Sequence, residues 1–330
     1  MAYFNNKKDN NNIIYSLNFL KFLAVFGVIC IHCSIFPTVQ YKGLVIDALA
    51  RFSVPAFFLI SGFFSYYDDN SIALHKYKTR MVKLIKLFII ANIVYFLFEF
   101  YTVYFGNLTA LILEKFTLYD IFYYFTYDVS PFGTHLWFIF ALIYCYLLFY
   151  ILTKFCVKPK ILYKFIPILI AATLFMSEFC KLIGMTFPLE YYRNFLFMGL
   201  PFFTIGYYIH DNESNLNKLS NTSAIILAFS GILLTILEVS FVGMSEIFVG
   251  TVIFITFVFI WCVKNPNRLY FRITDFIGGK LFTSMYILHV LVIMILAETI
   301  QTPSFIACSV LTVLISTLIY LINTKLNIKF

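Results

Sequence analysis

A histidine stands between two cysteines in the stretch VICIHCSIFP, residues 28–37. These residue types allow a metal site, a thiol redox pair, or proton transfer by His32. Zinc would need about four ligands, and no second Cys/His cluster accompanies Cys30 and Cys33. A thioredoxin-type pair requires a soluble fold around C-x-x-C, and the haem signature places its histidine after the second cysteine. We therefore expect no metal, interpret both cysteines as packing residues, and take His32 as the functional residue.

The composition indicates which solvent surrounds this histidine. The 330 residues are 62% hydrophobic and 12% charged, whereas a soluble domain has about a quarter of its residues charged. Too few polar side chains remain to cover a water-facing surface. We predict an all-α, polytopic membrane protein with the lipid bilayer as a partner. The net charge of +8 does not indicate a nucleic-acid partner, because Lys and Arg collect in the cytoplasmic loops of membrane proteins.

About ten apolar runs are long enough to cross a bilayer. The sequence contains no internal repeat and no linker, so we expect a single membrane-embedded domain over residues 1–330 with a polar cytoplasmic tail at 1–13. The first run is too long for the core of a cleavable leader, and we expect it to remain as an anchor. The predicted spans are 14–35, 45–66, 83–105, 136–155, 161–180, 194–210, 222–241, 246–263, 280–299 and 304–323.

Positive charge orients these spans. Lys and Arg gather in alternate loops, while the opposite loops hold fewer of them and several acids. Both termini are therefore predicted to be cytoplasmic, which requires an even number of spans and places His32 at the outer end of the first helix. The basic residues of the predicted inner side are Lys7, Lys8, Lys76, Lys78, Arg80, Lys83, Lys86, Lys154, Lys158, Lys160, Lys164, Lys264, Arg268, Arg272, Lys280, Lys325 and Lys329.

Ionisable residues inside the spans are candidates for function, because burying them in lipid is costly. Lys21 and His32 are eleven positions apart, which places them on nearly the same helical face about 16 Å from each other. Both could line one cavity that runs inward from the outer side. The alternative is that Lys21 snorkels to the inner interface.

The second span begins with RFSVPAFFLISGFF. Pro55 frees backbone carbonyl groups one turn earlier, and Ser61-Gly62 permits the close approach of another helix. Arg51 could be an interfacial anchor, but its place beside a kinking proline favours a side chain that faces a cavity.

Two further histidines fall in the fourth and ninth spans. His135 and Trp137, in THLWFIFAL, are predicted at the outer interface, where tryptophan is also expected as a belt residue. In SMYILHV, Tyr286 and His289 share a helical face near mid-membrane, where a Tyr–His pair would satisfy the buried ring. Several acids in outer halves of spans could pair with Arg51 or orient a histidine. They are Glu99, Glu178, Glu238 and Glu298.

With these residues placed, the chain resembles the acyltransferase-3 family of integral membrane O-acyltransferases over nearly its whole length. Six segments occur in the family's order: LNFLKFLAVFGVICIH, RFSVPAFFLISGFF, the basic segment around Arg80, HLWFIFAL, LPFFTIGYYI and MYILH. The family's first helix typically carries an arginine, ten intervening residues and a histidine implicated in catalysis. Here Lys21 takes the arginine position, without the planar donor fork, and His32 keeps the spacing. Asn18 stands where the family often has an acid.

The resemblance implies transfer of an acyl group, most often acetyl, from acetyl-CoA to a sugar hydroxyl of a cell-surface polysaccharide or its lipid-linked precursor. The expected location is the cell membrane. His32 would be the general base, and Arg51 and His135 would steady the developing oxyanion or the sugar. A route through an acyl-enzyme intermediate is also open. The residues expected at the acyl-CoA site are Lys21, Arg80, Tyr286 and His289.

Two other classes of protein fit parts of the pattern. A transporter or flippase for a glycolipid would use the same basic loops and intramembrane histidines, but transporters of this size often show inverted repeats, and none is found. A membrane sensor, or the anchoring half of a larger complex, would tolerate the loss of His32, Arg51 and His289 together. The acyltransferase is the preferred hypothesis.

Overall fold

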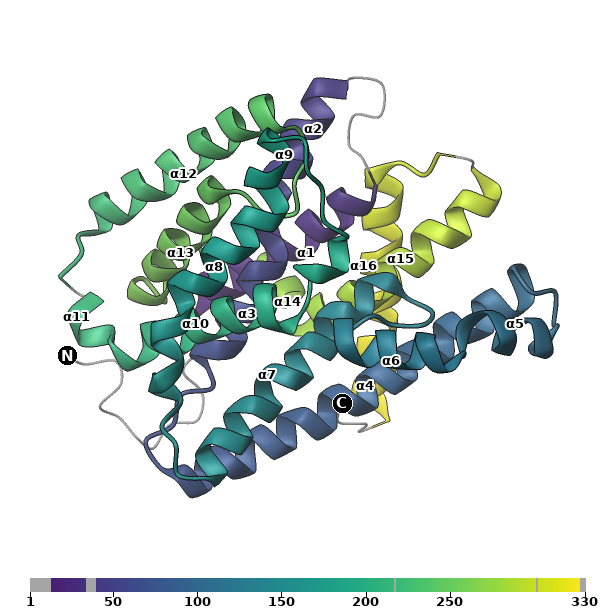
Figure 1. Ribbon diagram of the computed structural model, residues 1–330, viewed down its shortest axis with the longest axis horizontal. Helices are drawn as coiled ribbons and strands as arrows, with labels where there is room; N and C mark the ends of the chain where they lie inside the picture. Colours follow the sequence, from purple (N-terminus) through teal and green to yellow (C-terminus); the bar gives the residue numbers. More distant parts are fainter. Residues whose placement is uncertain (1–12, 34–39, 217, 301, 327–330) are drawn as a thin grey trace.

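The computed structural model describes residues 13–33, 40–216, 218–300 and 302–326, so the first twelve residues of the predicted polar tail lie outside it. This described part is built from helices and contains no strand, which confirms the all-α prediction (Figure 1). Its α-helices are α1 (Tyr15–His32), α2 (Gln40–Ala50), α3 (Ser53–Phe63), α4 (Asn70–Thr102), α5 (Leu108–Lys115), α6 (Leu118–Tyr127), α7 (Trp137–Lys154), α8 (Ile166–Leu174), α9 (Cys180–Leu182), α10 (Leu200–Asp211), α11 (Glu213–Leu216), α12 (Asn221–Val242), α13 (Val249–Lys264), α14 (Arg272–Phe276), α15 (Phe282–Thr299) and α16 (Phe305–Lys325).

Eight helical stretches of the described chain are long and apolar enough to cross a membrane. α13 is apolar but shorter, and α10 continues a π-helical segment, Phe195–Gly199. The prediction of ten spans with cytoplasmic termini counts these two elements as membrane crossings, and it stays a prediction. The eight stretches are 15–32, 42–63, 70–102, 134–154, 159–182, 221–242, 272–299 and 305–325.

α1 lies in the interior of the bundle. It contacts α2, α3, α13, α14, α15 and α16, and Figure 1 shows α4 and α7 side by side at one edge with α12 and α13 at another. Buried small and branched residues, Ala24, Val25 and Ile29 among them, allow neighbouring helices to surround α1. The helix that carries Lys21 and His32 is therefore held from several directions.

The predicted second span is broken where the sequence places its proline. α2 ends at Ala50 and α3 begins at Ser53, so Arg51 stands in the break between them. Proline at position 55 has no N–H to bond the carbonyl four residues earlier, and that carbonyl belongs to Arg51. The break places Arg51 inside the 42–63 stretch and away from its end.

α4 begins thirteen residues before the predicted span at 83–105. The side chain of Asp69 caps it by accepting hydrogen bonds from the backbone N–H groups of Ser71, at 2.7 Å, and Ile72, at 3.0 Å. The prediction that Lys76, Lys78 and Arg80 lie in a loop is wrong, because this cap starts the helix ahead of them. Arg80 therefore projects from a rigid helix.

The segment between α4 and α7 contains α5, α6 and the buried carboxyl group of Asp128. This residue ends α6 with a left-handed φ of 58°. One carboxylate oxygen accepts from the N–H of Phe195, and the other has no partner among the described residues. Burial, opposed in part by that N–H, raises the pKa of Asp128 from 3.8 to about 7.

Asp128→Asn should stabilise the protein at alkaline pH. Between pH 3.8 and about 7 the folded state retains a proton that the unfolded state has lost, so stability falls as pH rises through this window. Asparagine keeps a carbonyl acceptor for Phe195, tolerates the left-handed backbone, and removes the buried charge. The thermal midpoint of the variant should exceed that of the wild type above about pH 7 and approach it near pH 4. Parallel profiles for the two proteins would contradict the assignment.

Candidate active site

Three histidine rings from distant parts of the chain meet at the end of α1. His32 is its last residue, His135 lies in the 3-10 turn Thr134–Leu136 that precedes α7, and His289 lies on α15. The ring centroids of His32 and His135 are each 5.1 Å from that of His289, and they are 6.4 Å from each other. We call these three residues the histidine cluster.

The members of the cluster differ in burial. The side chains of His135 and His289 are 4% and 0% exposed, whereas His32 is exposed. His32 is therefore the ring of the cluster that lies at the surface of the protein, and the other two rings lie behind it. The described residues contain no group of three His, Cys, Asp or Glu side chains placed to hold a metal ion.

Backbone carbonyl groups fix the two buried rings. Nδ1 of His289 lies 2.6 Å from the carbonyl oxygen of Tyr286, and Nε2 of His135 lies 3.3 Å from that of Ile287. A carbonyl oxygen only accepts, so each of these ring nitrogens carries the hydrogen in the neutral imidazole. The other nitrogens, Nε2 of His289 and Nδ1 of His135, are then acceptors, and both are buried with no partner in the described part of the protein.

Two tyrosines complete the support of the cluster. The hydroxyl group of Tyr286 donates to the backbone carbonyl of His135. Tyr95, from α4, donates to the carbonyl of Ile287 at 2.7 Å and accepts from the N–H of Leu291 at 3.0 Å. Sequence analysis missed Tyr95, because a tyrosine in an apolar run of this aromatic-rich chain carries no distinguishing signal.

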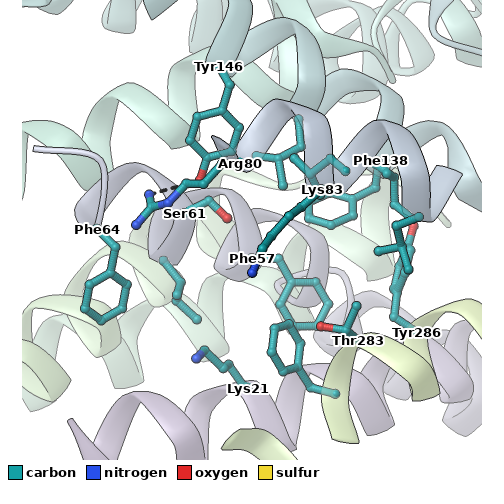
Figure 2. Close-up of a pocket in the computed structure, with 16 residues that line it drawn as sticks. Lys21, Phe57, Ser61, Phe64, Arg80, Lys83, Phe138, Tyr146, Thr283 and Tyr286 are labelled. Carbon is teal, nitrogen blue, oxygen red and sulfur yellow. Dashed lines mark hydrogen bonds between the residues drawn. The ribbon is translucent and has the colours of Figure 1, made fainter. Parts of the chain in front are cut away.

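Tyr286 also lines a cavity of about 330 Å³ (Figure 2). Its sixteen lining residues include three cations, Lys21, Arg80 and Lys83, and no carboxylate. The remainder are mostly apolar and come from α3, α4, α7 and α15, with Phe57, Leu84, Leu142 and Phe282 as examples. A pocket with an apolar wall and a few convergent charges is the usual form of a site for a large organic anion.

The cations are held in different ways. Arg80 donates hydrogen bonds to the hydroxyl groups of Ser65, at 3.0 Å, and Tyr146, at 3.2 Å, the second drawn in Figure 2. Lys21 lies 5.0 Å from the ring centroid of Phe282 and 3.4 Å from the side-chain oxygen of Asn18. Lys83 is exposed. None of the three is in a salt bridge within the described chain, so their charges remain available to a ligand.

Aromatic rings separate this cavity from the histidine cluster. Phe57, Phe138 and Tyr286 line the cavity and pack on one another, with ring centroids 5.2 to 6.1 Å apart. Tyr286 is in turn 5.9 Å from both His135 and His289. The predicted single cavity running from Lys21 to His32 is therefore interrupted in this conformation, because His32 does not line it.

The structure distributes the predicted site residues over three places. Lys21, Arg80 and Tyr286 line the cavity, whereas His289, expected beside them, belongs to the histidine cluster. Arg51 forms a half-buried salt bridge with Glu246.

Three of the four acids considered as partners of Arg51 have other roles. Glu99 pairs with Lys115 at 2.6 Å, and Glu178 and Glu238 accept backbone N–H groups at the start of α13. Trp137 is 5% exposed and packs 6.2 Å from the ring of Phe58. The belt interpretation of Trp137 is therefore wrong, because the ring faces the interior of the bundle.

Arg193 is a further residue that sequence analysis did not select. Its guanidinium group lies 5.7 Å from the ring centroid of Trp137, and the charges of Arg51 and Arg193 both lie close enough to act on the His32 ring. Glu246 neutralises Arg51, but Arg193 has no salt bridge to any residue that the structure describes. The position of Arg193, in a loop after α9, gave no signal in the sequence.

Comparison with known proteins identifies the family of the chain. Residues 14–321 match the acyltransferase 3 family, described as an acyltransferase domain. The chain belongs to this family of membrane O-acyltransferases, and it is a multi-pass membrane acyltransferase. No curated protein and no solved structure matches it.

Proposed function

We propose that the protein transfers an acyl group, with acetyl the expected group, from coenzyme A to a hydroxyl group of a cell-surface polysaccharide or its lipid-linked precursor. One observation carries the proposal. The cavity that contains three cations is also lined by Tyr286, which donates a hydrogen bond to the backbone carbonyl of His135 in the histidine cluster. Tyr286 therefore contacts both the proposed donor site and the proposed acceptor site.

The cavity suits the donor. Acetyl-CoA is a multiply phosphorylated anion with a long, flexible pantetheine arm, and Arg80 is already oriented by two hydroxyl groups to contact a phosphate. Lys21 and Lys83 add charge without a fixed hydrogen-bond geometry. The arm would extend along the apolar wall towards Phe57 and Phe138, and these rings must move aside for the thioester to reach His32.

The histidine cluster suits the chemistry of the acceptor. In the proposed step, His32 takes the proton of the sugar hydroxyl while the oxygen attacks the thioester carbonyl carbon. The tetrahedral oxyanion then collapses, the C–S bond breaks, and the coenzyme A thiolate leaves and is protonated. Arg193 is the better placed of the two nearby arginines to stabilise the oxyanion, because Glu246 already offsets the charge of Arg51.

Arg80→Ala should weaken donor binding more than catalysis. Charge-assisted hydrogen bonds contribute about 1.5–3 kcal/mol, so we expect the KM for acetyl-CoA to rise by about 10- to 100-fold with a smaller change in kcat. Initial rates in membrane vesicles over a series of donor concentrations measure this. Lys86→Ala is the matched control, since this cation of α4 is exposed and does not line the cavity. An unchanged KM for acetyl-CoA in a folded Arg80→Ala variant would show that this cavity does not bind the donor.

The proposed function itself is tested by comparing the surface glycan of wild-type and deletion cells by mass spectrometry. Loss of the acyl modification on a glycan that still reaches the surface supports the acyltransferase. Glycan trapped inside the deletion cells favours the transporter or flippase.

A further inference from the structure

Two cysteines that are 275 positions apart in the chain have their sulfur atoms 3.2 Å apart. Cys33 directly follows His32 at the end of α1, and Cys308 lies in the first turn of α16. Both side chains are buried, at 5% and 0% exposed. No other two cysteines are in sulfur contact in the described part of the chain.

The environment of this pair holds its two sulfur atoms together. Cys33 is the C-terminal capping residue of α1 and its sulfur also lies 3.0 Å from the carbonyl oxygen of Pro303, in the turn before α16. Cys308 is fixed by the start of α16, where Ser304 caps the helix. Cys30, the other cysteine of the opening motif, instead faces the carboxyl group of Asp47 at 3.8 Å. Cys30 and Cys33, although they have the C-x-x-C spacing, are therefore not paired with each other. The sulfur atom in contact with that of Cys33 belongs to Cys308, near the other end of the sequence.

A bond between Cys33 and Cys308 would join two helices next to His32. α1 and α16 are the first and last helices of the bundle, and a covalent bond between them would close a loop over nearly the whole chain. Such cross-links stabilise a fold chiefly by restricting its unfolded state, and more so for long loops. The bond would also fix the residue next to His32, at the end of α1 that carries the histidine cluster.

We propose that Cys33 and Cys308 form a disulfide bond that ties α1 to α16 beside His32. The proposal rests on the predicted orientation, in which this end of α1 faces the outer, oxidising side of the membrane where disulfides persist. The oxidant is a protein dithiol oxidase in its disulfide form. The thiolate of Cys33 attacks the oxidant's disulfide to give a mixed disulfide, and the thiolate of Cys308 then displaces the oxidant's second sulfur. Two protein thiols become one disulfide, and the oxidant leaves with two thiols that have taken up the two protons.

Direct chemical analysis tests this bond without any measurement of acyl transfer. Membranes are quenched with acid as cells are harvested, free thiols are blocked with N-ethylmaleimide in denaturant, and the digested protein is analysed by mass spectrometry. We expect a peptide pair linked through Cys33 and Cys308 that disappears on reduction. Recovery of both cysteines in the alkylated form without prior reduction overturns the proposal.

A stability cycle provides a second test. Cys33→Ser, Cys308→Ser and the double variant should all have the same lowered thermal midpoint, and a reductant should lower the wild-type midpoint to that value while leaving the variants unchanged. Cys180→Ser is the matched control, since Cys180 is buried with no sulfur partner in the described structure. This variant should still yield the peptide pair linked through Cys33 and Cys308. A reductant effect of equal size in the wild type and the double variant overturns the proposal.

Discussion

Replacement of His32 by alanine is expected to reduce acyl transfer by a factor of about 10²–10⁴, the usual contribution of a positioned general base. His32 is the exposed member of the histidine cluster, so the change removes a proton acceptor without opening a cavity in the core. The donor cavity is not lined by His32, and the KM for acetyl-CoA should therefore stay near its wild-type value. Transfer of labelled acetyl groups to glycan in membrane vesicles at saturating donor measures the effect.

The control for this experiment is His75→Ala, because His75 is an exposed histidine of α4 outside the cluster. It should retain wild-type activity. Near-normal transfer by a folded His32→Ala protein would exclude His32 as the base. A loss of activity accompanied by a large rise in the donor KM would instead assign His32 to donor binding.

The sequence was sufficient to predict the class of the protein and the identity of several chemically important residues. Low charge content, long apolar runs and ordered family segments each follow from local composition, and the all-α fold and the acyltransferase family are confirmed. Lys21 was chosen because an ionisable residue in an apolar helix is costly. Arg80 was chosen from a basic segment that resembles the family, and Tyr286 because it shares a helical face with His289. The structure places all three on one cavity.

The meeting of residues from different helices at one place was not predictable from these sequence patterns. Positions 32, 135 and 289 lie on different elements, and helical periodicity relates only residues within one helix. His135 and His289 were therefore assigned separate environments, although their rings are 5.1 Å apart. The same limit explains why Arg193 and the contact of Cys33 with Cys308 were missed.

The predicted start of a helix was wrong where a local polar interaction extended the helix beyond its apolar part. The segment from Asn70 to Val82 is too charged to be selected as an apolar span, yet the Asp69 cap and continuous helical bonding extend α4 through it. Arg80 consequently occupies a fixed position on a helix, which is a better basis for a phosphate contact than the flexible loop that hydropathy predicted.

Two glycines control the packing that positions the donor cavity. α3 and α10 cross so closely that a Cβ atom built on Gly62 would lie 1.8 Å from the carbonyl oxygen of Phe203, and one on Gly206 would lie 2.0 Å from that of Leu59. Both obstacles are backbone atoms of the opposite helix, which cannot rotate away as a side chain can. The close approach is reciprocal, so each helix depends on a glycine in the other.

Gly62→Ala and Gly206→Ala should each strongly destabilise the protein, because the two helices must separate to admit one methyl group. Overpacking of a core usually costs about 1–3 kcal/mol, and we expect these variants at or above the upper end because backbone must shift. Separation would also displace Phe57 of α3 from the cavity wall, so any folded fraction should show impaired transfer. Thermal midpoints by fluorescence-detected size-exclusion chromatography in detergent, together with the yield of monodisperse protein, measure the loss.

Gly279→Ala is the control for these variants, because the three atoms nearest to a Cβ there belong to the side chains of Asn18 and Asp275, at 3.1 Å or more. A small change is expected for it. The double variant Gly62→Ala with Gly206→Ala should be less destabilised than the sum of the single changes, since one separation of α3 from α10 relieves both clashes. Full additivity, or wild-type midpoints for the single variants, would show that the two helices do not meet at these glycines.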